Sequence, residues 1–334
     1  MTSTPVLVAH ADWSKHVEKR WLAVAQQQAD GCFYAEAPEP VQDAGRLLDN
    51  LRTRSGPQAA ILAGFDFPIG IPQAYAQAAG VASFLDFLPW LAHGDWQNFY
   101  HPALNKEQIS LQRPFYPDKP GSTSQHDLIQ RLQKAGLGIT TLHDLRRRCE
   151  MAHEGRRAAA PLFWTMGAQQ VGKAALAGWK ELLQPAHRQG EIAIWPFSGP
   201  LLALLQPGST TVVETYPAEF MAQFIQSTSI APPARLSKRS SCSRMEAGWL
   251  LFEQAQQHGI VLPNDLSNKI KSGFGPKPDG EDAFDAAIGL LGMLATLQNW
   301  HTRPDPAAGM PVWLSVEGWI FGQPWQICPD QNPV

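Results

Sequence analysis

The order of the elements predicted for the first 70 residues is the feature that most restricts the fold. Apolar runs bounded by turn residues predict strands at residues 6–11, 21–25, 32–35 and 59–65, and helical spacing predicts a helix at residues 41–54. Asp30 and Gly31 form a tight-turn signal, so the second and third strands should form a hairpin. The order strand, strand, strand, helix, strand predicts a mixed sheet in which an antiparallel meander leads through a helical crossover to a parallel strand.

The pattern breaks at residue 71 and returns near residue 206. Residues 71–205 are rich in Trp, Pro and Gln, with short helices expected at residues 129–135 and 170–183. A strand at residues 210–215 and helices at residues 244–258 and 282–297 follow, and residues 316–322 are expected to form a final short strand or an ordered loop. We therefore predict an α/β fold with a five-stranded mixed sheet flanked by helices. Its parts are a first core segment (1–70), a large, mainly helical insertion (71–205), a second core segment (206–327) and a tail (328–334).

Composition excludes several classes of protein. With 334 residues, 44% of them hydrophobic and 17% charged, the chain is expected to fold rather than to be disordered. A net charge of −3 argues against a protein that binds nucleic acid through overall positive charge, although a local basic patch is compatible with it.

The cysteines and the N-terminal residues predict the cellular compartment of the protein. Cys32, Cys149, Cys242 and Cys328 form no CxxC pair, which is typical of reduced thiols in a cytosolic protein. The opening residues lack a charged segment followed by a long apolar run, so no signal peptide is expected. The apolar stretch at residues 286–297 is too short to span a bilayer. These features predict a cytoplasmic protein with no membrane partner.

Carboxylates follow or end three of the predicted strands. Asp12, Asp66 and Glu214 occupy these positions, and ligand sites of open α/β sheets form where strand ends gather. Asp282 and Asp285 lie three residues apart at the start of a predicted helix, so both can face one direction. Small residues on that face, such as Gly289, would let the helix approach the sheet. We expect these acids to converge on one site.

Several carboxylates in a small space must either take up protons or bind a hard cation. Oxygen ligands without His or Cys favour Mg²⁺ or Mn²⁺, and two such ions can activate water and stabilise the leaving oxygen of a phosphodiester. Each acid also has an ordinary interpretation as a turn residue or a helix N-terminal residue. The joint pattern favours the functional interpretation.

Six segments resemble a family of predicted nucleases with a ribonuclease-H-like fold, known as the domain of unknown function DUF429. They are ADWS (11–14), GFDFPIGIP (64–72), VVETYPAE (212–219), SKRSSCSR (237–244), DGEDAFDAAIG (279–289) and VEGWIFG (316–322). The resemblance implies a ribonuclease-H-like sheet and a metal-dependent phosphodiesterase or nuclease site.

The resemblance also implies roles for individual residues. It gives Asp12, Asp66, Glu214 and Asp285 as the catalytic acids and, with Asp282, as the metal ligands for Mg²⁺ or Mn²⁺. Lys238, Arg239 and Arg244 follow the strand that carries Glu214, and they could balance phosphate charge beside the metals, with Lys238 as a catalytic cation, or belong to a solvated loop. Ser14, Arg239, Arg244 and Glu317 are then the expected substrate contacts. The run Arg146, Arg147 and Arg148, with Arg156 and Arg157, could hold a nucleic-acid backbone or form a charged helix face.

Two alternative functions stay open. One is an ATP-dependent phosphotransferase of the actin and sugar-kinase type, which needs glycine-rich phosphate turns that the sequence does not display. The other is a non-catalytic binding protein that keeps the fold and the acids. Nucleic acid is a possible partner in the leading hypothesis, and the sequence does not determine the oligomeric state.

Overall fold

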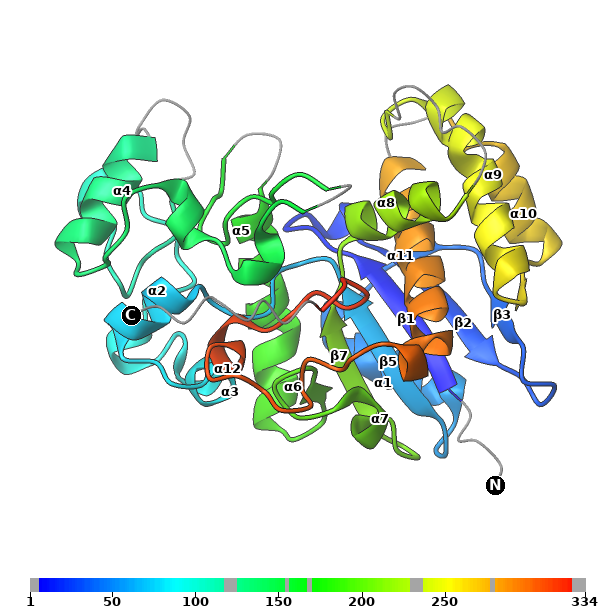
Figure 1. Cartoon of the computed structure of the whole chain (residues 1–334), viewed down its shortest axis with the longest axis horizontal. Helices are drawn as coiled ribbons and strands as arrows, with labels where there is room; N and C mark the ends of the chain where they lie inside the picture. Colours follow the sequence, from blue (N-terminus) through cyan, green and yellow to red (C-terminus); the bar gives the residue numbers. More distant parts are fainter. Residues whose placement is uncertain are drawn as a thin grey trace.

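The computed structural model describes residues 6–116, 125–153, 156–166, 170–228, 237–276 and 280–325. Its fold is α/β, with a mixed sheet of eight strands flanked by helices (Figure 1). The strands are β1 (Val6–Asp12), β2 (Trp21–Gln27), β3 (Phe33–Ala35), β4 (Glu39–Pro40), β5 (Ala60–Phe65), β6 (Ala193–Ile194), β7 (Thr210–Glu214) and β8 (Ile260–Val261). The α-helices are α1 (Leu47–Ser55), α2 (Gln73–Ala79), α3 (Phe84–Phe87), α4 (Gln125–Lys134), α5 (Val171–Gly178), α6 (Gln184–Arg188), α7 (Leu201–Leu204), α8 (Pro217–Ser227), α9 (Ser241–Gln257), α10 (Asn264–Lys271), α11 (Gly280–Gln298) and α12 (Leu314–Glu317). The predicted tail, 328–334, lies outside the described residues.

The sheet contains all five predicted strands in the order β3, β2, β1, β5, β7. β1, β2 and β3 are antiparallel neighbours, whereas β1, β5 and β7 run parallel. The predicted meander and crossover are therefore confirmed. The prediction of five strands was too low, because β4, β6 and β8 are two-residue strands. A two-residue strand is too short to produce an alternating apolar and polar pattern, so the sequence gives no signal for it.

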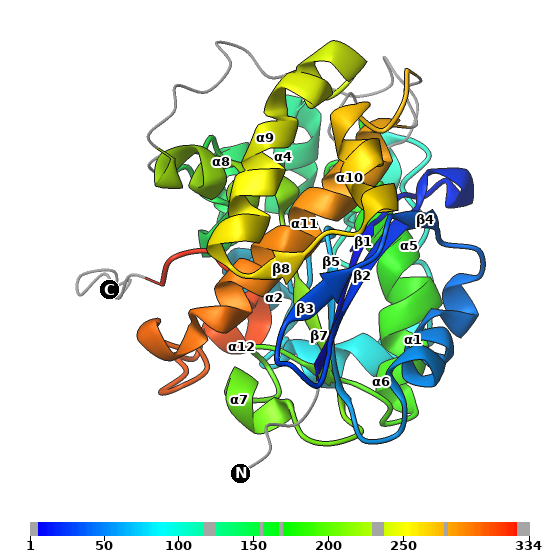
Figure 2. The same cartoon turned by 90° about the vertical axis from the view of Figure 1, so that its right-hand side faces the viewer.

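Helices cover both faces of the sheet. Figure 2 shows α9, α10 and α11 on one side and α1, α5 and α6 on the other. Alternate residues of β1 belong to two separate hydrophobic cores, with Leu7 and Ala9 on the α1 side and Val8 on the α11 side. Burial on both faces explains why the central strands are continuous apolar runs rather than alternating ones.

Helix α11 lies unusually close to the sheet, because glycines face the strands and the neighbouring helix. A Cβ atom on Gly289 would lie 2.2 Å from ring atoms of His10 on β1, and one on Gly292 would lie 2.1 Å from the ring of Phe220 on α8. His10 is fully buried, and burial lowers its pKa to about 3, so the imidazole is neutral at physiological pH. The close approach carries the first turn of α11 to the carboxyl ends of the strands.

Replacing Gly289 with alanine is expected to destabilise the protein by about 1–3 kcal/mol, because the added methyl group overlaps a ring that packing holds in place. Gly138 provides a matched control, since a Cβ there meets no atom within 4 Å. Urea denaturation of both variants checks the prediction. Equal stability of the Gly289→Ala and Gly138→Ala variants would contradict the close packing of α11 on β1.

Residues 71–205 pack against the sheet rather than standing apart from it. Their apolar side chains, including Tyr75 and Trp179, share one hydrophobic core with β1, β5 and α1. The segment also contributes β6, which pairs with β7 at one end of the sheet. The predicted helix at 170–183 is α5 followed by a π-helical turn, Trp179–Leu183.

The C-terminal segment returns to the sheet. Residues 316–322, expected to form a strand or an ordered loop, include the end of α12 and a single bridge between Glu214 and Ile320. None of the described helices is both long enough and apolar enough to cross a bilayer.

Candidate functional site

Two aspartates lie side by side at the carboxyl ends of adjacent parallel strands. Asp12 is the last residue of β1, and Asp66 directly follows β5. The strands are paired up to Ala11 and Phe65, so the two carboxyl groups emerge at the same edge. The backbone N–H of Trp13 donates a 2.6 Å hydrogen bond to Oδ1 of Asp66, which fixes one oxygen of this carboxyl group.

The electrostatics of this pair show that further acids lie close by. Asp12 is only 9% exposed. Burial raises its pKa well above the usual range, and the neighbouring carboxylates of Asp66, Asp285 and Asp282 raise it further. Burial also raises the pKa of Asp66, to about 7, against the stabilising hydrogen bond from Trp13. The fold thus brings together four of the five predicted metal ligands.

Lys238 is the cation that faces this cluster. Its Nζ lies 2.5 Å from Oδ1 of Asp285. Burial works against the charged ammonium, but the carboxylate of Asp285 prevails and raises the pKa of Lys238. The ion pair neutralises one of the four carboxylates and places a positive charge beside the others.

Arg244 was predicted to contact substrate, but the structure commits it to another task. Its side chain is fully buried, and it donates hydrogen bonds to the backbone carbonyls of Lys238, Gly273 and Gly275. It therefore joins the loop that carries Lys238 to the loop before α11.

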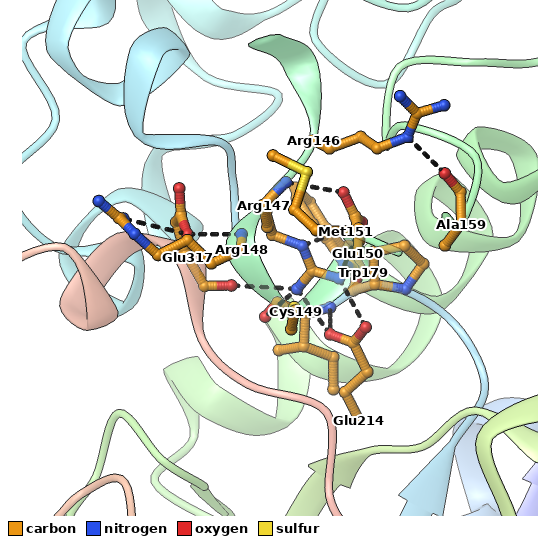
Figure 3. A network of polar contacts seen from close by, with 12 residues as sticks. Arg146, Arg147, Arg148, Cys149, Glu150, Met151, Ala159, Trp179, Glu214 and Glu317 are labelled. Atoms are coloured by element: carbon orange, nitrogen blue, oxygen red, sulfur yellow. Dashed lines mark hydrogen bonds and ion pairs between the residues drawn. The ribbon is translucent and has the colours of Figure 1, made fainter. Parts of the chain in front are cut away.

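Glu214 lies on β7 but is not part of the aspartate cluster. Figure 3 shows its carboxylate facing Arg147, which comes from the insertion. Arg147 Nη1 and Nη2 lie 2.7 and 2.6 Å from the two oxygens of Glu214, and the backbone N–H of Ile69 donates a further bond of 2.6 Å. Both oxygens are occupied, so the arrangement does not support the predicted role of Glu214 as a metal ligand.

Glu317 is likewise committed to structural contacts. The carboxylate is 3% exposed and accepts hydrogen bonds from the backbone N–H groups of Gln73 and Arg148. These bonds join the C-terminal segment to the insertion, and they leave Glu317 without the exposure that the predicted substrate contact requires. The other two predicted contacts lie nearer the surface: Arg239 is exposed and Ser14 is partly buried beside Asp66.

The aspartate cluster opens into two adjoining hollows. The first, here called the acidic pocket, has a volume of about 400 Å³ and is lined by Asp66, Pro68, Glu150, Ala159, Ala160, Val171, Glu214, Thr215, Tyr216, Pro217, Ala218, Lys238, Glu281, Asp285 and Ile320. The second, here called the basic pocket, has a volume of about 260 Å³ and is lined by Trp13, Ser14, Lys15, His16, Asp66, Gln170, Val171, Lys173 and Ala174. Asp66 and Val171 line both.

The structure adds residues that the sequence interpretation missed. Arg147 was considered only as one of five arginines that might bind nucleic acid, yet it is the buried partner of Glu214 and of Glu150. No local signal distinguishes it from its neighbours. Tyr216 lines the acidic pocket, and burial raises the pKa of its hydroxyl. Its position directly after the predicted strand was a usable signal.

The donor set suits a hard cation, but the ligands are not assembled into a complete shell. Asp12, Asp66, Asp282 and Asp285 offer only oxygen atoms, the ligands that Mg²⁺ and Mn²⁺ prefer. Burial first, and then the neighbouring carboxylates, raise the pKa of Asp12 and Asp66, so a bound cation would stabilise their charged forms. Within the part of the chain that the structure describes, no three His, Cys, Asp or Glu side chains already have metal-binding geometry.

Comparison of the chain with protein-family models, with curated proteins and with solved structures found no match.

Proposed function

We propose that this protein is a metal-dependent hydrolase of phosphodiester bonds. One observation carries the proposal: buried Asp12 and partly buried Asp66 end adjacent parallel strands beside Asp282 and Asp285, and burial together with the neighbouring carboxylates raises the pKa of both strand-end aspartates. Holding carboxylates this close together and away from water costs free energy. Such a cost is typical of a functional site, where binding of a cation recovers it.

We infer that the sheet is ribonuclease-H-like and that the chain is related to the DUF429 family. The antiparallel meander β1, β2, β3 and the helical crossover through α1 to the parallel strand β5 support this proposal. The carboxyl ends of β1 and β5 carry the acids that the resemblance implies. Glu214 departs from that pattern, because Arg147 holds it.

The residues of the cluster would have distinct tasks. Asp12, Asp66, Asp282 and Asp285 would hold Mg²⁺ or Mn²⁺, and the ion would activate water and stabilise the leaving oxygen. Lys238 would place positive charge beside the phosphate and so favour binding of the dianionic transition state. Tyr216 forms part of the pocket wall beside Lys238. Nucleic acid is the proposed substrate class.

Binding of Mn²⁺ provides the direct test, and it should depend on pH. Asp66, with a pKa of about 7, is mostly protonated at pH 6 and mostly ionised at pH 8. A metal ion must displace this proton at pH 6, so we expect Mn²⁺ to bind about tenfold more tightly at pH 8. Titration calorimetry measures both affinities. An affinity for Mn²⁺ that is equal at the two pH values would contradict the assignment of Asp66 as a ligand.

A second function is favoured by one contact. The Lys238–Asp285 ion pair neutralises one carboxylate without a metal ion. Such a pair is compatible with a non-catalytic binding protein that keeps the fold and the acids. Hydrolysis of bis(p-nitrophenyl) phosphate in the presence of Mn²⁺ separates the two functions. Release of p-nitrophenol above the rate for the Asp12→Asn variant supports the hydrolase, and absence of both Mn²⁺ binding and release supports the binding protein.

A further inference from the structure

We propose that a hollow beside the C-terminal segment binds one nucleotide with a single-ring base. The hollow, here called the aromatic pocket, lies between residues 300–306 and 322–325 and against Trp195. None of the residues that the sequence predicts to form a site lines it. The inference rests on the proposed function for the view that this nucleotide belongs to the substrate. It does not rest on that function for the existence of the site.

The aromatic pocket has the size and the walls of a site for one flat ring. Its volume is about 160 Å³, and an apolar cavity of about 150 Å³ holds one benzene ring. Trp195, Trp300 and Trp325 supply aromatic surface, and proline rings form much of the remaining wall. Tryptophan binds flat rings by stacking and by edge contacts. A pyrimidine therefore fits the pocket, whereas the fused rings of a purine are too large to be enclosed.

Arg303 gives the pocket a positive charge that has no ion-pair partner among the described residues. The side chain is partly buried, and Nη1 donates a 2.8 Å hydrogen bond to the backbone carbonyl of Gly322. Glu219 acts on the guanidinium from beyond ion-pair distance, but its carboxylate oxygens accept hydrogen bonds from Arg156 and Gln223. Burial outweighs this acid and lowers the pKa of Arg303. An anion bound in the pocket would supply the missing partner.

Gln323 adds a second polar group that lacks a partner. Its Oε1 atom is buried, and no hydrogen-bond donor among the described residues reaches it. A buried polar atom without a partner costs free energy, so such an atom in the wall of a pocket points to a ligand that completes the bond. The amide of Gln323 offers an acceptor beside a donor, which matches the N–H and C=O groups on the pairing edge of a pyrimidine.

These features together select the chemistry of the ligand. It must carry a flat ring for the tryptophans, an N–H donor for Gln323 and an anionic group for Arg303. A pyrimidine nucleotide has all three groups. An aromatic amino acid has a ring, an ammonium group and a carboxylate, so the position of the pocket in the fold must decide between the two.

The position of the aromatic pocket favours a nucleotide, because only one turn separates it from the acidic pocket. Ile320 lines the acidic pocket and bridges to Glu214 at the end of β7, where the segment after α12 passes the sheet (Figure 1). The backbone N–H of Gln323 donates a 3.2 Å hydrogen bond to the carbonyl of Ile320. The first and fourth Cα atoms of such a turn lie within about 7 Å of each other. A strand whose phosphodiester faces Asp66 can therefore extend its next nucleotide into the aromatic pocket.

Titration calorimetry in EDTA tests the site without a metal ion and without hydrolysis. The probes are thymidine monophosphate, thymidine, deoxyribose 5-phosphate, deoxyadenosine monophosphate and phenylalanine. We expect thymidine monophosphate to bind about tenfold more tightly, or better, than each of the others. It alone combines a ring of the right size with groups for both Arg303 and Gln323.

Variants of the arginine test which group holds the phosphate. Arg303→Gln should lower the affinity for thymidine monophosphate about tenfold or more and leave the affinity for thymidine unchanged. Arg303→Lys keeps the charge and should retain part of the preference for the phosphate. The matched control is Arg46→Gln, which removes an exposed arginine that does not line the pocket and should bind like the wild type. Thermal unfolding establishes that the variants are folded.

Four results would overturn the proposal: equal affinity for thymidine monophosphate and thymidine, equal affinity for the thymidine and deoxyadenosine monophosphates, a phosphate preference that survives in Arg303→Gln, or a preference for phenylalanine. A failure of the proposed function looks different. In that case bis(p-nitrophenyl) phosphate stays intact with Mn²⁺, whereas binding of thymidine monophosphate and its dependence on Arg303 are still measured.

Discussion

Replacing Asp12 with asparagine is expected to remove Mn²⁺-dependent phosphodiester hydrolysis while leaving the protein at least as stable as the wild type. Asp12 is buried and has three other carboxylates as neighbours, so it would be a ligand of any metal ion that these carboxylates bind. We expect a loss of activity on the order of 10³-fold, which exceeds the 10- to 100-fold loss typical of residues that only support a metal ligand. The matched control is Asp49→Asn, which alters an exposed acid on α1.

Replacing an acid of this cluster is expected to lower activity but to raise stability, and the Asp66→Asn variant shows the change in stability most clearly. Asparagine can still accept the hydrogen bond from Trp13, but it carries no charge. Folded Asp66 keeps its proton up to pH about 7, whereas in the unfolded chain an aspartate releases it near pH 4. Between these values the unfolded state binds fewer protons, so the stability of the wild type falls as the pH rises.

The Asp66→Asn variant has no ionisable group at this position, so its stability does not fall in this way as the pH rises. After allowance for solvent screening of a partly exposed carboxyl group, we expect it to be about 2 kcal/mol more stable than the wild type at pH 8, with little difference near pH 4. Urea denaturation at several pH values measures the trend. A variant that is less stable than the wild type at pH 8 would show that the charge of Asp66 is compensated in the folded protein without a cation, which would contradict a cation site there.

Replacing Arg147 with methionine is expected to lower the free energy of unfolding by about 3–5 kcal/mol, because it leaves buried carboxylates without a partner. The arginine is 0% exposed, and it pairs with Glu214 and Glu150, which are 4% and 2% exposed. It also donates to the backbone carbonyls of Ile69 and Glu317. These contacts connect the insertion, β7 and the C-terminal segment (Figure 3).

A double-mutant cycle distinguishes loss of the ion pair from loss of packing. Arg147→Met combined with Glu214→Gln removes both charges of the main pair, so it should recover part of the stability that Arg147→Met alone loses. Arg147→Lys keeps the charge but cannot form the two-pronged contact with Glu214, so an intermediate loss is expected.

The control for this series is Arg54→Met. Arg54 pairs with Glu36 and Glu39 at the surface, and exposed pairs of this kind contribute about 1 kcal/mol or less. Urea denaturation gives all the free energies. If Arg147→Met costs no more than Arg54→Met, the buried network does not hold the insertion to the sheet.

Most of the sheet and part of the site could be predicted from sequence, because the signals are local. The five longer strands appear as apolar runs, and the hairpin appears as the Asp30–Gly31 turn. The position of Asp12 and Asp66 at strand ends follows from where those runs stop. Gly289 indicated a helix that could approach the sheet, and the structure shows that approach against His10.

The tertiary structure alone decided which of the candidate residues meet. Glu214 looks like Asp12 and Asp66 in sequence, but its carboxylate is held by an arginine 67 positions away in the insertion. Arg244 and Glu317 are polar residues that sequence cannot distinguish from substrate contacts, and their bonds to distant backbone groups are set by packing. A strand fixes where its own side chains emerge, because that depends on neighbouring residues. The partner of a buried charge depends on contacts between segments far apart in the chain, and only the folded protein determines those.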